Sequence, residues 1–230
     1  MKKIIVLTGA GISAESGLKT FRDSGGLWEG HDVMEVASID GWRKNPKLVL
    51  DFYNQRRTQA KQSKPNPGHA ALAALEEHFD VTIITQNVDI LHETAGSSRV
   101  IHLHGNLFQA KSSVDESLIY DIGEREIKVG DLCEKGSQLR PNIVWFGEMV
   151  PMMEKAINVT MDADAFMVIG TSLVVYPAAG LINYVPQKAP IYLVDPHTPE
   201  VSARENLFLF QEPASSGVSK AINHLINFMG

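Results

Sequence analysis

The sequence has little cysteine, no long apolar run and no excess of basic residues. Cys133 is the one cysteine among 230 residues, so an internal disulfide is excluded and a cytoplasmic location is expected. No stretch approaches the roughly 18 apolar residues of a membrane-spanning helix, which argues against a membrane partner. The net charge is −6, and this acidic balance argues against a dedicated nucleic-acid partner.

Short apolar runs rich in β-branched residues alternate with helical patterns along the chain. The first run, residues 4–7, follows two lysines but is too short for a signal peptide, so a buried strand is expected. Runs without polar alternation are typical of strands covered on both faces. The alternation predicts an α/β fold with a doubly wound, Rossmann-like parallel sheet. The predicted strands are residues 3–7, 81–84, 99–103, 143–145, 165–169 and 190–194, and the predicted helices are residues 45–61, 67–78, 88–94, 152–161, 177–185 and 216–228.

Two segments break this alternation. Residues 109–140 are polar and punctuated by glycine, which predicts a small module inserted into one catalytic domain. That domain would comprise residues 1–108 and 141–230. Residues 20–39 form a long glycine-containing loop, and long loops in compact domains are often functional lids.

A glycine-rich turn, residues 9–17, follows the first predicted strand. A strand, a glycine turn and a helix start together present backbone N–H groups to a phosphate, although a plain tight turn into a helix is the alternative. The glycine spacing is longer than in dinucleotide-binding dehydrogenases, and no second strand with an acidic end follows about 20 residues later. The pattern therefore predicts nucleotide binding but disfavours hydride transfer.

Polar side chains follow four of the predicted strands. They lie at residues 85–89, 102–105 and 170–172 and at Asp195. Ligands of an open α/β sheet bind beyond the carboxyl ends of its strands, so these clusters predict one site.

His102 and His104 are two residues apart on one predicted strand, so their side chains face the same way. They could form a metal-binding pair, or one could be a catalytic base and the other a structural neighbour. A metal site needs further ligands, and no cysteine lies nearby, so no metal is expected. An imidazole with a pKa of about 6.5 is mostly neutral at pH 7, which suits His104 to the role of general base.

Six motifs follow one another along the chain: Gly9-Ala-Gly-Ile-Ser-Ala-Glu-Ser-Gly17, Thr20-Phe21-Arg22, Thr85-Gln-Asn-Val-Asp89, His102-Leu-His-Gly105, Trp145-Phe-Gly-Glu148 and Gly170-Thr-Ser172. In this order they resemble the sirtuin family. The group that the chain resembles comprises bacterial NAD-dependent protein deacylases similar to the desuccinylating branch, and the resemblance covers nearly the whole chain.

The resemblance implies a reaction and a cofactor, NAD. The acyl-lysine oxygen would attack the ribose carbon as nicotinamide leaves, and His104 would take a proton from a ribose hydroxyl. The products would be free lysine, nicotinamide and O-acyl-ADP-ribose, and residues 20–39 would form the cofactor-binding loop. The residues implied to contact NAD are Gly9, Ala10, Gly11, Ile12, Ala14, Glu15, Phe21, Arg22, Trp28, Gln86, Asn87, Asp89, Gly170, Thr171, Ser172, Asp195 and Ala214.

Acyl-lysine proteins or peptides are the implied partners, bound as an extended strand between two segments. Tyr53 and Arg56 share a face of a predicted helix, and their spacing alone would suggest a solvated surface. The resemblance implies instead that they bind an acyl carboxylate while Ala37 leaves room for it, so succinyl, malonyl and acetyl groups would be removed. The residues implied to line the peptide strand are Val144, Phe146, Gly147, Glu148, Val174 and Tyr176.

The chain departs from most sirtuins at the position of their structural zinc, which four cysteines hold. Cys133 is present, but Ser112, Ser113 and Ser137 lie near the other expected positions. Because serine does not replace a zinc thiolate, no zinc is expected, and apolar packing would hold the module together. Three other functions stay open: a dehydrogenase, a protein mono-ADP-ribosyltransferase, and a nucleotide-binding module without turnover.

Overall fold

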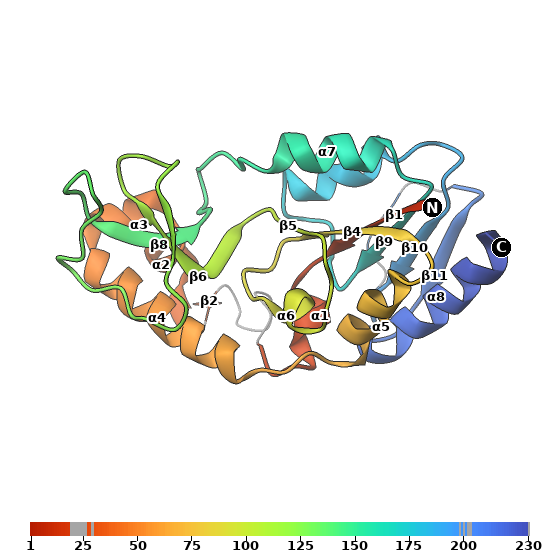
Figure 1. The fold of residues 1–230 in the computed structure, drawn as a ribbon, viewed down its shortest axis with the longest axis horizontal. Coiled ribbons are helices and arrows are strands. Elements are labelled where there is room, and N and C mark those ends of the chain that lie inside the picture. Colours follow the sequence, from red (N-terminus) through yellow and green to blue (C-terminus); the bar gives the residue numbers. More distant parts are fainter. Residues whose placement is uncertain (19–26, 29, 198, 200, 202–203, 230) are drawn as a thin grey trace.

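The computed structural model of the protein describes residues 1–18, 27–28, 30–197, 199, 201 and 204–229. Phe21 and Arg22, both implied to contact NAD, lie outside the described residues. A large α/β unit carries both chain ends, and a smaller unit lies at the other end of the long axis (Figure 1). Among the described residues, no helix is long and apolar enough to cross a membrane.

Six parallel strands form the main sheet, in the order β11-β10-β9-β1-β4-β5. The first strand, β1, lies inside the sheet and pairs with β4 on one side and β9 on the other. The chain therefore winds outward from β1 in both directions, which confirms the predicted doubly wound fold. The strands are β1 (Lys3–Thr8), β4 (Asp80–Thr85), β5 (Val100–His102), β9 (Ala165–Ile169), β10 (Ile191–Val194) and β11 (Leu207–Phe210).

Both faces of the main sheet are covered. In β1, Ile4 and Val6 pack toward helices α5 (Pro67–Leu75) and α8 (Ala214–Met229). The alternate residues of β1 pack on the opposite face toward helix α7 (Met153–Met161) and the 3₁₀ helix η1 (Ala178–Tyr184) (Figure 1). Successive side chains of a strand point to opposite faces, and both are apolar here because both are buried.

For the main sheet, one predicted strand was wrong and one strand was missed. Residues 143–145 were expected in the main sheet, but Ile143 ends β8 (Leu139–Ile143) of a separate antiparallel sheet. This apolar run is buried in the small unit and not in the main sheet. An apolar run predicts that a strand is buried, but it does not predict which sheet the strand joins. The missed strand is β11, whose half-buried residues lie at the sheet edge. The predicted helix 88–94 is a single turn, α6 (Leu91–Thr94).

The small unit combines two parts of the chain. A three-stranded sheet of β6 (Gly105–Ser112), β7 (Ile119–Asp121) and β8 shares one apolar core with helices α2 (Val33–Val36), α3 (Ile39–Lys44) and α4 (Pro46–Gln62). The predicted insertion, residues 109–140, contains the end of β6, all of β7 and the start of β8. Two short pieces complete the described elements near it: the β2–β3 pair (Leu27–Trp28 and His31–Asp32) and helix α1 (Ala10–Ala14).

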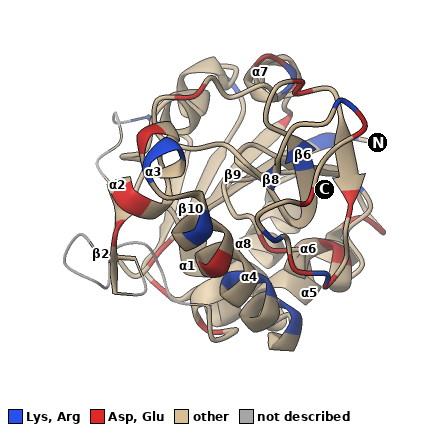
Figure 2. Ribbon diagram, turned by 90° about the vertical axis from the view of Figure 1, so that its left-hand side faces the viewer, with Lys and Arg blue, Asp and Glu red and all other residues tan. Residues whose placement is uncertain are grey.

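Acidic and basic residues are interspersed over the elements visible in Figure 2. Helix α3 carries an exposed pair, Asp40 and Arg43, and helix α4 carries Lys47 beside Asp51. Exposed ion pairs of this kind contribute little to the stability of a fold. Each pair also lies within one helix, so neither joins the two units.

A buried arginine fastens helix α4 to the small sheet. Arg57 is 2% exposed, and its Nε donates to the carbonyl of Leu107 over 2.6 Å. Its Nη1 donates to the side-chain oxygen of Asn54 over 2.8 Å and to the carbonyl of Arg125 over 3.2 Å. Burial lowers the pKa of Arg57 to about 10, which still leaves the guanidinium charged at neutral pH.

Arg57→Met is expected to lower the free energy of unfolding by about 2 to 3 kcal/mol, because the buried Leu107 carbonyl loses its donor. Urea denaturation measures this change. Arg43→Met, on an exposed helix face, is the matched control and should change stability by no more than about 0.5 kcal/mol. Equal losses in the two variants would contradict the fastening role of Arg57.

Candidate active site

Three glycines bring the ends of β1 and β9 into backbone contact. The N–H of Gly9 donates to Ile169 over 3.0 Å, and that of Gly11 donates to Gly170 over 2.8 Å. A Cβ on Gly11 would lie 2.6 Å from the Cα of Gly170, and Gly170 itself has φ of +61°. No other residue type meets both demands. This bare backbone lies where the strand order reverses, which is where doubly wound sheets bind ligands.

Polar side chains frame the glycine contact. Gln86, after β4, donates from Nε2 to the hydroxyl of Thr171 over 3.0 Å and so links the ends of β4 and β9. Glu15, after α1, accepts from the N–H and hydroxyl of Ser215, next to Ala214 at the start of α8. Asp195 follows β10 and accepts from the N–H of His197 over 2.8 Å. These residues thus come from the ends of β4, β9, β10 and α1 and from the start of α8.

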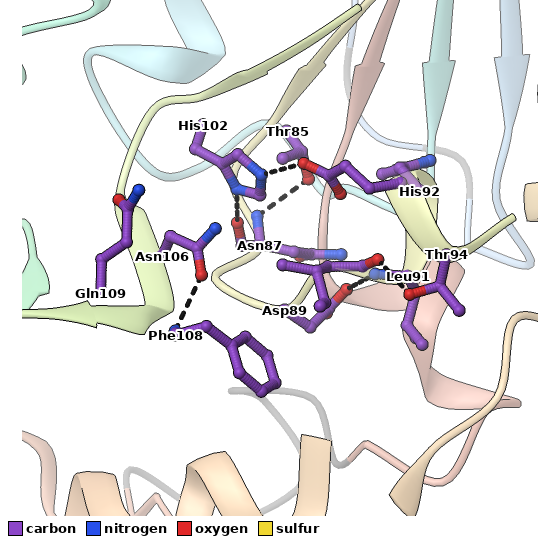
Figure 3. Close-up of polar contacts among 12 residues, drawn as sticks. Thr85, Asn87, Asp89, Leu91, His92, Thr94, His102, Asn106, Phe108 and Gln109 are labelled. Atoms are coloured by element: carbon purple, nitrogen blue, oxygen red, sulfur yellow. Dashed lines mark hydrogen bonds and ion pairs between the residues drawn. The ribbon is translucent and has the colours of Figure 1, made fainter. Parts of the chain in front are cut away.

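A buried chain of hydrogen bonds connects the glycine turn to Asp89. Asn87 donates from Nδ2 to the carbonyl of Gly9 and to the hydroxyl of Ser13, each over 3.1 Å. Ser13 in turn donates to Oδ2 of Asp89 over 3.0 Å, while Oδ1 accepts from the N–H of Leu91. Figure 3 shows Asn87 and Asp89 side by side in the turn after β4. Burial raises the pKa of Asp89, whereas its two donors oppose that rise.

His104 is held in one tautomer. Its Nδ1 lies 3.0 Å from the carbonyl oxygen of Gln86, and a carbonyl only accepts, so Nδ1 carries the proton. Nε2 is then the lone-pair nitrogen, and it has no hydrogen-bond partner within the described part of the chain. Burial lowers the pKa of His104, although the Gln86 carbonyl opposes this shift. The imidazole is therefore neutral at pH 7 and able to accept a proton.

His102 has different partners from His104. Its Nδ1 lies 3.2 Å from the carbonyl oxygen of Asn87, and its Nε2 lies 2.7 Å from Oε1 of Glu93 (Figure 3). In the described residues, no group of three or more His, Cys, Asp and Glu is placed to hold a metal ion. Two neighbouring imidazoles thus have separate environments.

The two segments expected to line a peptide strand present exposed apolar side chains. Phe146 is 44% exposed, Val174 is 62% exposed and Tyr176 is 74% exposed. The N–H of Phe146 donates to the carbonyl of Ala37 over 2.9 Å, so Ala37 lies directly behind this segment. Val144, before it, donates to the carbonyl of His104 over 2.9 Å. The segment is therefore hydrogen-bonded both to His104 and to the small unit.

The carboxylate of Glu148 faces into the protein. Arg140 donates to its two oxygens over 2.7 and 2.8 Å, and the N–H of Trp145 donates to Oε2 over 2.8 Å. The guanidinium carbon of Arg140 also lies 3.6 Å from the ring centroid of Trp145. Glu148 was expected to touch a substrate, yet its side chain supports residues 145–148 from behind.

Tyr53 and Arg56 are buried, although their spacing alone suggested a solvated surface. Tyr53 is 0% exposed, and its hydroxyl accepts from Nε1 of Trp145 over 3.0 Å. Arg56 is 6% exposed and donates to Gln59 over 2.9 Å, with its guanidinium carbon 5.4 Å from the ring centroid of Trp28. Trp28 was expected at the cofactor, and its ring packs edge-on against Tyr53.

Comparison with known proteins identifies the family. A family model described as the Sir2 family matches residues 9–177. The chain belongs to the Sir2 family. It is 53% identical over 226 residues to the NAD-dependent protein deacylase of Helicobacter pylori, covering 98% of each chain. It is 51% identical over 231 residues to the NAD-dependent protein deacylase of Bacteroides thetaiotaomicron, covering 98% of this chain and 99% of the other.

A solved structure agrees with this assignment. The crystal structure of a Sir2 homologue–NAD complex superposes with a TM-score of 0.87 at 37% identity, covering 100% of this chain and 91% of the other. The sirtuin resemblance and the Rossmann-like fold are confirmed.

The residues at which the sequence resemblance places a structural zinc are one thiol and hydroxyl groups in the small unit. The sulfur of Cys133 lies 3.4 Å from the hydroxyl of Ser112 and 3.1 Å from that of Ser137, and the two hydroxyls are 3.0 Å apart. The hydroxyls lower the pKa of the Cys133 thiol to about 7. One thiol with two serines does not fit a structural zinc, which takes four thiolate or imidazole ligands.

The contacts of three residues of this Sir2-family site were not predicted from the sequence. Ser13 lies within the glycine turn and bridges Asn87 to Asp89, and its place two residues after Gly11 was the available signal. Trp145 stands in one of the motifs, but its partner Tyr53 is distant in sequence, and no local pattern marked Glu93 as the partner of His102.

Glu148→Gln is expected to lower the free energy of unfolding by about 3 kcal/mol at pH 7, because it leaves the buried charge of Arg140 without its partner. Burial alone would raise the pKa of Glu148, but Arg140 and the Trp145 N–H hold it below its ordinary value. This contribution to stability is present above the unfolded pKa of about 4.3 and disappears as pH falls through the folded pKa.

Urea denaturation from pH 3 to pH 8 tests this expectation. The difference in stability between wild type and Glu148→Gln should be largest near neutral pH and should shrink below about pH 4. A difference that does not vary with pH would show that the ion pair with Arg140 does not carry the effect.

Proposed function

We propose that this Sir2-family chain removes succinyl and malonyl groups, as well as acetyl groups, from protein lysines, and that it forms nicotinamide and O-acyl-ADP-ribose. At the coarser level, family and relatives agree: it is an NAD-dependent protein deacylase. The roles of individual residues, the removal of succinyl and malonyl groups, and a cytoplasmic location are parts of the proposal.

One observation carries the proposal: a neutral imidazole and a hydrogen-bonded carboxylate lie beside the same glycine contact. His104 accepts a proton at Nε2, and Asp89 is joined through Ser13 and Asn87 to Gly9. The glycines keep the β1 and β9 backbones close together, because a Cβ at Gly9 or Gly11 would collide with Thr171 or Gly170. A strand end followed by a glycine turn and a helix start is the layout that presents backbone N–H groups to a pyrophosphate. These features fit NAD.

Bound NAD supplies a ribose carbon that becomes electron-poor as nicotinamide leaves. Asp89 and the backbone of Ile12 would hold the carboxamide at that end, and the glycine turn would hold the pyrophosphate. His104 would accept a proton from a ribose hydroxyl, and the Gln86 carbonyl stabilises the imidazolium that results because it accepts from Nδ1. Gln86, Ser172 and Asp195 would bind the sugars and adenosine from their strand ends.

The substrate would bind as an extended strand between residues 144–148 and residues 174–176. The exposed side chains of Phe146, Val174 and Tyr176 would cover it, and backbone groups such as those of Gly147 would pair with it. This mode uses main-chain hydrogen bonds, so it accepts many protein sequences.

The acyl group would enter the core of the small unit. Tyr53, Arg56 and Trp28 lie together there, and the Trp145 ring links Tyr53 to the segment that contacts Ala37. A guanidinium in apolar surroundings favours a carboxylate through two parallel hydrogen bonds. Arg57 fits this role less well, because its Nε and Nη1 already donate to backbone carbonyls and Asn54.

His104→Ala should lower deacylation by roughly 10²- to 10⁴-fold, the contribution of a general base. In the assay, the protein is incubated with NAD and acetyl- or succinyl-lysine peptides. The released nicotinamide is measured, and the peptide masses are determined by mass spectrometry. Loss of the acyl group with release of nicotinamide supports the proposal. A gain of ADP-ribose on protein supports a transferase, NADH absorbance supports a dehydrogenase, and NAD binding without turnover supports a binding module.

Arg56→Met should lower kcat/KM for succinyl-lysine by roughly 10- to 100-fold, because a charge-assisted hydrogen bond to the acyl carboxylate is lost. Acetyl-lysine, which has no carboxylate, should change by less than about 3-fold. Arg56→Lys keeps the charge but lacks the planar guanidinium. Its kcat/KM for succinyl-lysine should lie between the values of the wild type and of Arg56→Met. Unchanged desuccinylation by Arg56→Met would rule out the assignment of Arg56.

A further inference from the structure

Two imidazoles of one chain segment reach successive carbonyls of the turn that follows β4. His104 reaches the carbonyl of Gln86, and His102 reaches that of Asn87. His104 keeps a free nitrogen for proton transfer, whereas His102 is bonded at both nitrogens. The function of His102 is therefore not explained by the chemistry assigned to His104.

The partners of His102 decide its charge. The Asn87 carbonyl and the Glu93 carboxylate are both acceptors, so the geometry is satisfied only when both ring nitrogens carry protons. The side chain of His102 is 15% exposed and that of Glu93 is 39% exposed, so the pair is partly shielded from water. Burial lowers the pKa of His102, but Glu93, the Asn87 carbonyl and Asp89 together raise it above its ordinary value.

His102 and Glu93 enclose the turn that carries Asn87 and Asp89. Asn87 lies at the start of this turn, and Glu93 lies in α6 after it, so the imidazole joins the two ends (Figure 3). Inside the loop that is closed in this way, Asp89 accepts from the N–H of Leu91, the first residue of α6. A shift of α6 would therefore move Asp89 and, through Ser13, the glycine turn.

We propose that His102 and Glu93 are a positioning pair that closes the turn of residues 87–93 and holds Asn87 and Asp89 in place for the nicotinamide end of NAD. This inference rests on the proposed function for its consequence, but the pair itself can be observed without catalysis. It adds to the site two residues that touch neither the cofactor nor the reacting atoms.

The remaining charges near His102 do not replace this role. Its titratable neighbours among the described residues are Glu93 and His92 on α6 and Asp89 in the turn. Burial and the neighbouring histidines lower the pKa of His92 to about 3, so it is neutral in the working range. His102 and Glu93 act in opposite directions on Asp89, so the pair works through geometry more than through net charge.

The loss of one proton from His102 predicts a pH dependence. A neutral imidazole has one N–H, so it can no longer donate to both acceptors, and the turn loosens as pH rises through the raised pKa of His102. Glu93→Gln restores both contacts without a charge, because the amide can donate to Nε2 while Nδ1–H still donates to Asn87. Glu93→Ala removes one contact at every pH.

The test measures kcat and KM for NAD between pH 6 and pH 9.5 with an acetyl-lysine peptide. For the wild type, KM should rise roughly 3- to 10-fold above the pKa of His102, the effect of one hydrogen bond. Glu93→Gln should abolish this rise and keep the low-pH KM, and Glu93→Ala should raise KM by a similar factor throughout. In every variant kcat should stay within about 2-fold, because His104 is unchanged.

Glu77→Gln removes an exposed carboxylate elsewhere and serves as the control, with the KM profile of the wild type. Nitrogen NMR of the histidine rings, assigned with His102→Gln, should show His102 doubly protonated at pH 7 in the wild type. A neutral His102 at pH 7, or an unaltered KM rise in Glu93→Gln, would overturn the proposal. A wild type that does not turn over acyl peptides would refute the proposed function alone, since the NMR result still tests the pair.

Discussion

The close contact between Gly9, Gly11 and Gly170 is the constraint on which the site depends. Parallel strands β1 and β9 end side by side. The glycines that follow them let the N–H of Gly11 donate to the carbonyl of Gly170 over 2.8 Å. A Cβ at Gly9 or Gly11 would collide with Thr171 or Gly170, so a side chain there would push the two backbones apart. Asn87 is then held by the carbonyl of Gly9, so the position of the polar turn after β4 follows from the glycine contact.

The environment of each titratable group sets its role. Burial lowers the pKa of His104, whereas Glu93 and the Asn87 carbonyl raise the pKa of His102. Both side chains leave the same short segment, yet they meet different partners. The carboxylates also differ in their partners: Asp89 accepts from Ser13 in the glycine turn, and Glu148 accepts from Arg140.

Much of the fold could be predicted from the sequence because its signals are local. The glycine turn, the polar residues at strand ends and the apolar runs each lie within a few residues, and five of the six predicted strands belong to the main sheet. Residues 143–145 were misplaced because an apolar run shows burial but not which sheet buries it. Strand β11 was missed because an edge strand is only half covered.

The contacts within the site could be predicted only in part. The partners of His102 and Glu148 precede them in the chain by no more than 15 residues. Which of these neighbours each side chain meets depends on how the turns between them fold, and spacing alone does not show that. The burial of Tyr53 and Arg56 likewise needed the small unit to form around helix α4. Spacing identifies the face of a helix, but the tertiary fold determines what covers it.

A crystal structure of the protein with NAD and an acyl-lysine peptide would test the central claim most directly. The account predicts the pyrophosphate on the backbone of Gly9 and Gly11, the carboxamide at Asp89, and a hydroxyl of the adjoining ribose within hydrogen-bond reach of Nε2 of His104. A dinucleotide bound away from the glycine contact, or a ribose beyond the reach of His104, would contradict it.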